Sequence, residues 1–274
     1  MIVVESGGTK STWVCRDSKG NLKKFILQGL HPQEINPEKV LAANDLISQN
    51  HLIGKDVYFF GAGCESSSGK KRITELLLEI GLNPKMIVSD VVGACMAVLG
   101  NDNGVAGILG TGAVAAYYQN QKVQQMTSGR GFILGDEGSG FDIGKRITVA
   151  CLDGKFTNYP DVEKSIHEYY GGKDKIVHAC SGIHSRFKIA GLTEVIADYR
   201  ENPIINKVLL NSFQDYTETA ILPLRHDGRV GMVGSVAYFF REEFSKVLSS
   251  NDIVLTKVVI AAVDDIYAFV ESKM

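Results

Sequence analysis

The segment "GRGFILGDEGSGFDIG", residues 129–144, combines glycines and acids in a way that suits contact with a ligand. It holds six glycines in sixteen residues, together with Asp136, Glu137 and Asp142. Glycine costs backbone entropy and occurs where a chain turns sharply or lies close to another group. A carboxylate inside such a turn has a fixed direction. The segment is therefore a candidate binding loop, although its residues alone do not identify the ligand.

A second glycine turn, "ESGGTKS" at residues 5–11, lies between the first two predicted strands. Its backbone N–H groups, with a hydroxyl and a lysine, suit a phosphate tail. The candidate phosphate-binding residues are Gly7, Gly8, Thr9 and Lys10. A plain β-turn that happens to hold two glycines remains an equal alternative at this point.

A third turn, "LGTGAV" at residues 109–114, occupies the equivalent position in the second half of the chain and contributes Gly110, Thr111 and Gly112. With Ala115 it fits the GxGxxG/A pattern of dinucleotide-binding proteins. The residues that follow are strand-like rather than helical, and no acid ends a second strand nearby, so a Rossmann interpretation is disfavoured. Two equivalent loops that face one another would instead grip a polyphosphate, one from each domain.

Two strand–helix junctions complete the set of candidate sites. In "VGSVAYF", residues 233–239, Gly234 and Ser235 lead from a strand into a helix, whose N-terminus can bind an anion. The junction is also a common one with no ligand. Asp90 follows the strand "MIVS" at the start of another helix. It is a candidate catalytic base, and a simple cap formed by Ser89 or Asp90 is an even alternative.

The order of predicted elements positions these motifs. A three-strand meander opens the chain, followed by helix, strand, helix, strand and helix, an order βββαβαβα. From residue 103 the meander returns, with helical segments predicted around 160–171 and 203–225 and a closing strand and helix. We therefore expect two structurally similar domains, residues 1–101 and 102–274, without clear sequence repetition.

Composition limits the classes of function. The 274 residues are 45% hydrophobic and 22% charged, with a formal net charge of −2 and no basic block, so nucleic acid is not an expected partner. The uncharged run 103–121 carries four glycines and predicts strand–turn–strand rather than a membrane helix. The apolar start is too short for a signal peptide. Five scattered cysteines indicate reduced thiols in a cytoplasmic protein.

The order of GGTK, "SD" before a helix, GTG, "GDEGSG" and VGS resembles the N-acetylglucosamine kinase and BadF/BadG-type ATPase family over essentially the whole chain. The segment 129–144 is the most specific motif and looks like the family's "GWGxLLGDEGS" sugar loop. The resemblance implies an α/β protein of two ribonuclease H-like domains, the actin-like ATPase fold, with a nucleotide and sugar cleft between them. It also implies ATP and Mg²⁺ as cofactors and an amino sugar as substrate.

The resemblance assigns roles to individual residues. Asp90 matches the catalytic aspartate, and Asp136 would accept hydrogen bonds from sugar hydroxyls while Gly129 and Gly131 let the backbone approach the ring. Glu5 would reach Mg²⁺ through water. Nucleotide contacts fall on the turns at residues 7–10 and 110–112, on Gly234 and Ser235, and on Gly191, which matches a position lining the adenine pocket.

Because of three departures from the family pattern, the motifs do not identify which amino sugar is the substrate. Ser6 replaces a common glycine, Arg130 stands where tryptophan is usual, and "GLHPQEI" at residues 29–35 lacks an expected asparagine. We expect phosphorylation of N-acetylglucosamine to N-acetylglucosamine 6-phosphate. Because Arg130 could pair with a carboxylate, N-acetylmuramic acid kinase activity in cell-wall sugar recycling is the alternative.

Two further functions compete with a sugar kinase. A BadF-type activator of a dehydratase would need thiolates close together for an iron–sulfur cluster, and the cysteines here are scattered. A sugar-sensing regulator would need a DNA-binding segment, for which neither end of this sequence has room. A homodimer is compatible with the family.

Overall fold

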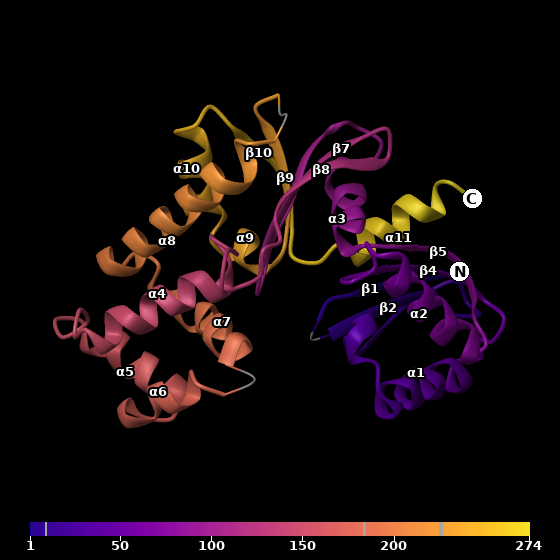
Figure 1. Ribbon diagram of the computed structural model, residues 1–274, viewed down its shortest axis with the longest axis horizontal. Helices are drawn as coiled ribbons and strands as arrows, with labels where there is room; N and C mark the ends of the chain where they lie inside the picture. Colours follow the sequence, from indigo (N-terminus) through magenta and orange to yellow (C-terminus); the bar gives the residue numbers. More distant parts are fainter. Residues whose placement is uncertain (9, 183–184, 225–226) are drawn as a thin grey trace. The chain divides into compact units, whose positions relative to one another are not determined.

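The computed structural model describes residues 1–8, 10–182, 185–224 and 227–274. The chain forms two compact units (Figure 1). One comprises Met1–Gly100 with Ala262–Met274, and the other comprises Asn101–Ala261. Each unit has its own five-stranded sheet, so an α/β fold built from two related halves is confirmed.

The N-terminal unit is built on a mixed sheet of strand order β3-β2-β1-β4-β5. Strands β1 (Ile2–Ser6), β2 (Lys10–Arg16) and β3 (Leu22–Gln28) form the predicted antiparallel meander. Strands β4 (Asp56–Gly61) and β5 (Asn83–Val88) extend the sheet in parallel on the other side of β1. A parallel extension needs crossover connections, which the predicted helices supply.

The helices of this unit begin at residues that favour a helix start. Asn36 caps α1 (Pro37–Gln49) by accepting a hydrogen bond from the Lys39 N–H at 3.0 Å, and Pro37 takes the first helical position. Ser66 caps α2 (Ser67–Glu79), and α3 (Asp90–Leu99) follows β5. A short 3₁₀ turn, η1 (Pro32–Glu34), precedes α1. The core between helices and sheet contains Trp13, Phe59, Ile73 and Leu77.

The second unit repeats the first sheet. Its strands are β6 (Gly104–Leu109), β7 (Ala113–Gln119), β8 (Lys122–Ser128), β9 (Arg229–Val233) and β10 (Val254–Val259). Their order is β8-β7-β6-β9-β10, with the first three antiparallel and the last two parallel, which matches the N-terminal sheet strand for strand. The predicted structural similarity of the two halves is confirmed.

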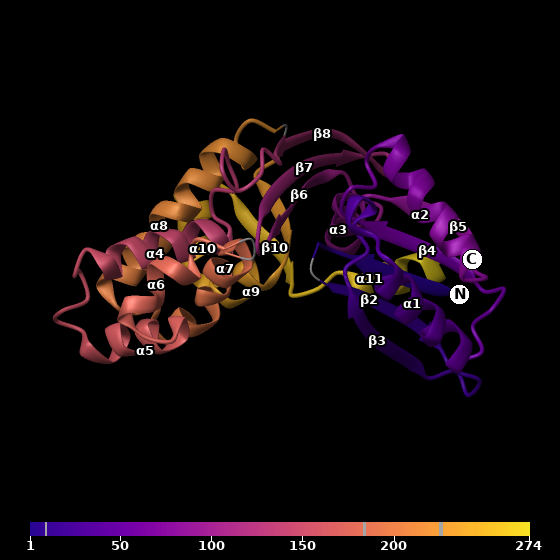
Figure 2. The same ribbon diagram turned by 60° about the horizontal axis from the view of Figure 1, so that its bottom comes forward.

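Helices occupy the rest of the second unit (Figure 2). A long helical insertion separates β8 from β9, as the sequence predicts around 160–171 and 203–225. Two helices, α9 and α10, then lie between β9 and β10. The helical elements of the unit are α4 (Gly140–Leu152), α5 (Pro160–Tyr170), η2 (Lys173–Lys175), α6 (Ile176–Ala179), α7 (Ser185–Ile196), η3 (Ala197–Tyr199), α8 (Pro203–Tyr216), the π-helical η4 (Thr217–Ile221), α9 (Ser235–Phe239) and α10 (Arg241–Ser249).

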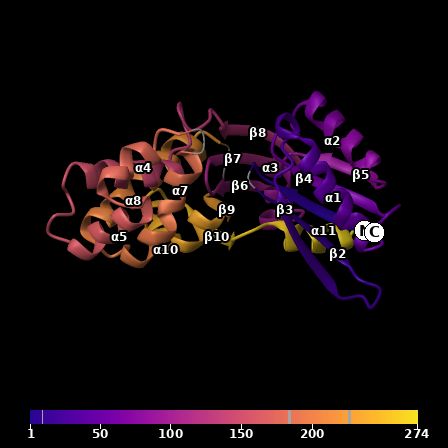
Figure 3. The same cartoon turned by 90° about the horizontal axis from the view of Figure 1, so that it is seen from below.

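The predicted domain boundaries need one correction. The break near residue 101 agrees with the structure, but the range 102–274 assigns the last helix, α11 (Val263–Glu271), to the wrong unit. This helix packs on α3, β1 and β2 of the N-terminal unit (Figures 1 and 3). Arg16 on β2 donates two hydrogen bonds to Glu271, at 2.8 and 2.9 Å. The amphipathic pattern predicts the helix but cannot tell which core it covers.

Candidate active site

The glycine turn at residues 5–11 is held against a neighbouring loop of the N-terminal unit. The Gly7 N–H donates to the Lys10 carbonyl at 3.0 Å, which closes the hairpin, while Thr9 lies outside the described residues. The Ser6 hydroxyl accepts from the Leu30 N–H at 2.8 Å. A Cβ atom on Gly29 would lie 2.4 Å from the Gly7 carbonyl oxygen, so only glycine fits there. Ser6, a departure from the family pattern, thus connects the segment 29–35 to the turn that is predicted to bind phosphate.

Glu5 is oriented by the helix that the sequence assigns to the other domain. Its half-buried carboxylate accepts hydrogen bonds from the backbone N–H groups of Ala262 and Val263, at the start of α11. Burial nevertheless raises the pKa of Glu5, and the charge of Asp90 raises it further. A carboxylate offers about four lone-pair positions, so two amide bonds leave room for ordered water.

Asp90 lies at the end of β5 and at the first position of α3, as predicted. Its Oδ1 accepts from the adjacent Val91 N–H at 3.0 Å, and Ser89, at the cap position, makes no capping bond through its side chain. Burial raises the pKa of Asp90 to about 6, and nearby Glu65 contributes in the same direction. The side chain is therefore a better base near neutral pH than a solvated aspartate.

Three predicted motifs meet around the GTG turn of the second unit. The N-terminus of α4 donates to this turn, from the Gly140 N–H to the Gly110 carbonyl at 2.7 Å and from the Phe141 N–H to the Thr111 carbonyl at 3.3 Å. Gly234 has φ of 120°, and a Cβ atom there would lie 2.2 Å from the Leu109 carbonyl oxygen. The exposed Ser235 follows at the start of α9.

Asp136 belongs to the same group of residues and lies in the segment 129–139 before α4, which we call the acidic loop. It is only 3% exposed and has φ of 63°, a conformation that is unfavourable for a residue other than glycine. Its carboxylate accepts from the Ala113 N–H and pairs with the Arg186 Nη2 at 3.1 Å. Burial raises the pKa of Asp136, while these two contacts oppose the rise. The residue is thus already engaged, and its role toward a sugar stays a prediction.

Asp142 supports the loop. Its carboxylate accepts from the Gly138 N–H at 3.2 Å, from the Ser212 hydroxyl at 2.6 Å and from the Arg146 Nε at 2.9 Å. Arg146 also donates to Asp215 on α8 at 2.6 Å. This network connects the acidic loop to two helices, so the contacts of Asp142 are structural.

The start of the acidic loop is open to solvent. Gly129 and Gly131 have φ of 74° and 77°, which agrees with the turns predicted there. Arg130 between them is exposed and forms no hydrogen bond or ion pair with any residue that the structure describes. Two apolar side chains further along the loop, Ile133 and Leu134, are also exposed, at 79% and 73%. The loop thus presents a free guanidinium beside apolar surface.

Helix packing requires glycine at position 191. Gly191 lies within α7, and a Cβ atom there would be 2.5 Å from the Tyr169 hydroxyl, which donates to the Lys188 carbonyl at 2.6 Å. Close packing of α5 against α7 therefore explains this glycine. Its predicted place in an adenine pocket stays a prediction.

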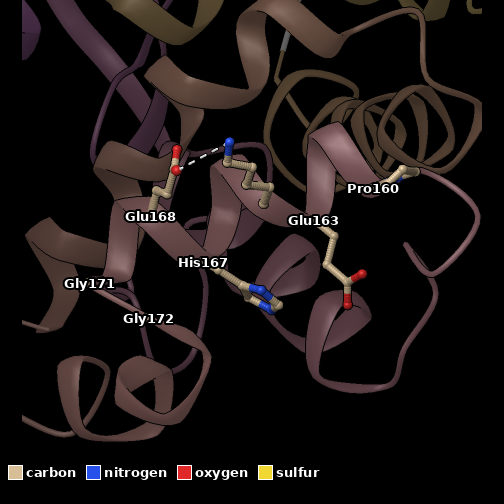
Figure 4. Close-up of a pocket in the computed structure, with 7 residues that line it drawn as sticks. Pro160, Glu163, His167, Glu168, Gly171 and Gly172 are labelled. Atoms are coloured by element: carbon tan, nitrogen blue, oxygen red, sulfur yellow. Dashed lines mark ion pairs between the residues drawn. The ribbon is translucent and has the colours of Figure 1, made fainter.

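A separate hollow of about 520 Å³ lies on the outer part of the helical insertion (Figure 4). Residues of α5 and the turn after it line the hollow, among them Glu163, His167 and Glu168. The only ion pair drawn there joins Lys164 to Glu168 at 3.8 Å. None of the predicted site residues lines it, so the hollow is not part of the candidate active site.

Sequence reasoning missed Arg186 and Glu65. Arg186 is the ion-pair partner of Asp136, and Glu65 raises the pKa of Asp90. Neither has a glycine motif or a fixed spacing beside it that could have drawn attention to it. Both reach their partners only through the folded arrangement of separate elements.

Comparison with known proteins agrees with these motifs. No protein-family model matches the chain. An N-acetylmuramic acid/N-acetylglucosamine kinase of Clostridium acetobutylicum is 26% identical over 209 residues, which cover 69% of this chain and 68% of that protein. A crystal structure from Porphyromonas gingivalis, described as a candidate N-acetylglucosamine kinase, has 25% identity and a TM-score of 0.85, with 99% of both chains covered. The resemblance to the N-acetylglucosamine kinase family is confirmed.

More distant structures bear on the fold alone. A candidate N-acetylglucosamine kinase from Chromobacterium violaceum has a TM-score of 0.74 at 18% identity, with 98% of both chains covered. A ROK-family glucokinase from Streptomyces griseus, solved with glucose and AMPPNP, has a TM-score of 0.50 at 14% identity and covers 97% of each chain. The predicted α/β fold of two related halves is therefore shared with these structures. In the described parts of the chain, no helix has the length and apolar character to cross a membrane.

Proposed function

We propose that this protein is an ATP-dependent amino-sugar kinase that transfers the γ-phosphate to a hydroxyl of N-acetylglucosamine, yielding N-acetylglucosamine 6-phosphate. The observation that carries the proposal is Asp90, a carboxylate that follows the edge strand β5 at the start of α3 and has its pKa raised to about 6. Phosphoryl transfer is largely dissociative and needs the attacking hydroxyl to be oriented, with its proton accepted late. A partly buried aspartate that is mostly ionised at neutral pH suits this task.

The glycine turns are suited to holding the nucleotide. In the second unit the GTG turn is fixed by α4 on one side and by Gly234 on another, so its backbone can approach phosphates without a bulky side chain in the way. In the N-terminal unit Gly8 and the exposed Lys10 offer further donors, and Gly7, whose N–H closes the hairpin, adds no side chain that would block a phosphate. We assign ATP phosphates to these turns, together with Thr9, Thr111 and Ser235.

The residues present fit a magnesium ion held through water. The Glu5 carboxylate accepts from two backbone N–H groups, which leaves lone pairs that can accept from water, and Mg²⁺ retains much of its hydration shell in kinases. We therefore assign Glu5 to Mg²⁺-bound water. When bound with ATP, Mg²⁺ neutralises charge on the phosphate oxygens.

Sugar recognition falls on the acidic loop. Gly129 and Gly131 leave space for a ring, and Asp136 supplies a directed carboxylate. N-acetylmuramic acid is a second candidate substrate because the free, exposed Arg130 suits the lactyl carboxylate, and the curated relative is described as acting on both sugars.

The test is a panel of N-acetylated amino sugars with Mg-ATP, scored for ADP release and for the position of the new phosphate by NMR. We expect phosphate on the 6-hydroxyl of N-acetylglucosamine. Steady ATP hydrolysis with no phosphorylated sugar, or a brown iron–sulfur protein after anaerobic purification, would instead indicate the dehydratase-activator alternative.

A further inference from the structure

Arg186 connects two motifs that the proposed function uses separately. From α7 its Nη2 reaches the Asp136 carboxylate of the acidic loop at 3.1 Å. The same nitrogen lies against the GTG turn, because a Cβ atom on Gly112 would be only 2.7 Å from it and 2.9 Å from the Asp136 Oδ2. The guanidinium also lies over the Phe132 ring, with its central carbon 5.2 Å from the ring centroid. Because position 112 is glycine, the Arg186 guanidinium can contact this turn.

The hydrogen-bonding capacity of Arg186 is not used up. Its Nε is buried and has no partner among the described residues, although a guanidinium carries five N–H donors. A buried donor without an acceptor is destabilising, so such a group is expected to find an anion or water in the working state. The side chain as a whole keeps 34% of its surface exposed. An incoming anion can therefore reach it.

Resting on the proposed function, we propose that Arg186 binds the terminal phosphates of the nucleoside triphosphate beside Gly112, and that its pairing with Asp136 couples nucleotide binding to sugar binding. Arg186 acts as a positioning residue. While the sugar is absent, Asp136 holds the guanidinium. A sugar hydroxyl that donates to Asp136 weakens this pair and leaves the fork free for phosphate oxygens, which it can bind in a bidentate manner.

The burial of Asp136 supports this exchange, in which a sugar hydroxyl replaces Arg186 as the donor to its carboxylate. At 3% exposure the carboxylate has little contact with water, so its partners are almost entirely the Ala113 N–H and Arg186. A buried ion is costly to leave unpaired, and Arg186 cannot leave until another donor replaces it. A sugar hydroxyl supplies this donor. Nucleotide affinity then depends on the sugar, and by linkage sugar affinity depends equally on the nucleotide.

The experiment measures binding without turnover, by calorimetry with Mg-AMPPNP and with pyrophosphate, each with and without N-acetylglucosamine. In the wild type we expect the sugar to tighten AMPPNP binding several-fold. Arg186→Met should weaken AMPPNP and pyrophosphate binding about tenfold or more and abolish the effect of the sugar. Asp136→Asn should act in the opposite direction and tighten both probes in the absence of sugar, because it releases the guanidinium.

Matched variants separate this role from structural support. Lys188→Met removes a cation two residues further along α7 that contacts Tyr169 instead, at 2.7 Å from its carbonyl oxygen, and should leave AMPPNP affinity unchanged. Arg186→Lys keeps the charge without the fork and should recover part of the affinity. If Arg186→Met is poorly folded, Arg186→Lys and Asp136→Asn still decide the question.

Two results would overturn the inference: AMPPNP affinity that is unchanged in Arg186→Met or Arg186→Lys, or Asp136→Asn that fails to tighten either probe. Failure of the kinase proposal has a different signature. In that case no sugar is phosphorylated, while the opposite effects of the two substitutions on pyrophosphate binding persist.

Discussion

Asp136 and Arg186 stand 50 residues apart in the sequence, and their side chains form an ion pair of 3.1 Å across the GTG turn. The pair connects the acidic loop to α7 at the point where Gly112 passes. One member is almost fully buried and has a backbone conformation that is rare outside glycine. Strained and buried charges of this kind gather at functional sites, where neighbouring structure holds them in place.

Gly112→Ala tests how closely the turn and the ion pair fit. The added Cβ would meet both the Arg186 Nη2 and the Asp136 Oδ2 at under 3 Å, so we expect the pair to separate and the protein to lose roughly 1–3 kcal/mol of stability. Gly110→Ala is the matched control, since its Cβ would meet nothing within 4 Å. Thermal unfolding of both variants makes the comparison. Equal melting temperatures of the two variants would show that the turn accommodates a Cβ atom at position 112 without strain.

Asp90→Asn tests the catalytic base. The amide keeps the size of the side chain and can still accept from the Val91 N–H, so sugar and ATP binding should persist. The kcat should fall by about two to four decades, the usual contribution of a positioned base. Ser89→Ala is the control for helix capping and should preserve kcat, because Ser89 makes no capping bond with its side chain. Near wild-type turnover by Asp90→Asn would place the base elsewhere.

The pH dependence of kcat should reflect the raised pKa of Asp90. The ionised form accepts the proton, so kcat should rise with pH through about 6 and then level off. Glu65→Gln should move this limb to lower pH, because the charge of Glu65 contributes to the elevation. The exposed Glu65 lies outside the assigned site, so its removal separates titration of Asp90 from titration of ATP itself. If kcat of Glu65→Gln rises over the same pH range as in the wild type, the rise reflects titration of the nucleotide rather than of Asp90.

Stability should respond to the same carboxylate with a definite sign. The pKa of Asp90 in the folded state, about 6, exceeds the value of 3.8 expected when unfolded. Between these values the folded state binds more protons, so the free energy of unfolding falls as pH rises from about 4 to 6. Asp90→Asn should therefore be more stable than the wild type at pH 7.5 by on the order of 1 kcal/mol, after allowance for solvent screening.

Urea unfolding at pH 4.5 and 7.5 measures this difference. The gain from Asp90→Asn should be clear at pH 7.5 and small at pH 4.5. Asp45→Asn on the exposed surface of α1 is the control and should change neither value. A gain that is equal at both pH values would come from packing rather than from ionisation.

Local patterns were sufficient to predict most of the fold. The order of elements along the chain follows from short-range signals, such as Asn36 and Pro37 at the start of α1 and the turn at Asn120–Gln121, whose residues have φ of 52° and 59°. The positions of the glycine turns could be predicted because glycine marks places where the backbone leaves no room for a side chain. Position 234 is one example, where the Leu109 carbonyl excludes any Cβ atom.

Contacts between distant segments could not be predicted in this way. The return of α11 to the N-terminal unit depends on which core its apolar face covers, and this return brings the Ala262 and Val263 N–H groups to Glu5. Arg186 was missed for a similar reason. It is one of many basic residues on helices, and only the approach of α7 to the GTG turn distinguishes it.

The last prediction concerns Arg130 and the choice of sugar. The guanidinium is exposed, lies between two glycines in left-handed conformation and has no protein partner in the described part of the chain. It is therefore free to pair with a carboxylate on a ligand, and N-acetylmuramic acid differs from N-acetylglucosamine by a lactyl carboxylate. We expect Arg130→Ala to lower kcat/KM for the muramic sugar about tenfold or more, as for the loss of a hydrogen bond to a charged group.

The corresponding kcat/KM for N-acetylglucosamine should change little in Arg130→Ala, because that sugar offers no negative charge to the guanidinium. Arg130→Lys should retain part of the muramic activity, since the charge stays while the planar fork is lost. Raising the salt concentration should reduce the wild-type preference, because the pair lies at the surface and is screened. An equal loss for both sugars, or no wild-type activity on the muramic sugar, would contradict the assignment and leave N-acetylglucosamine as the substrate.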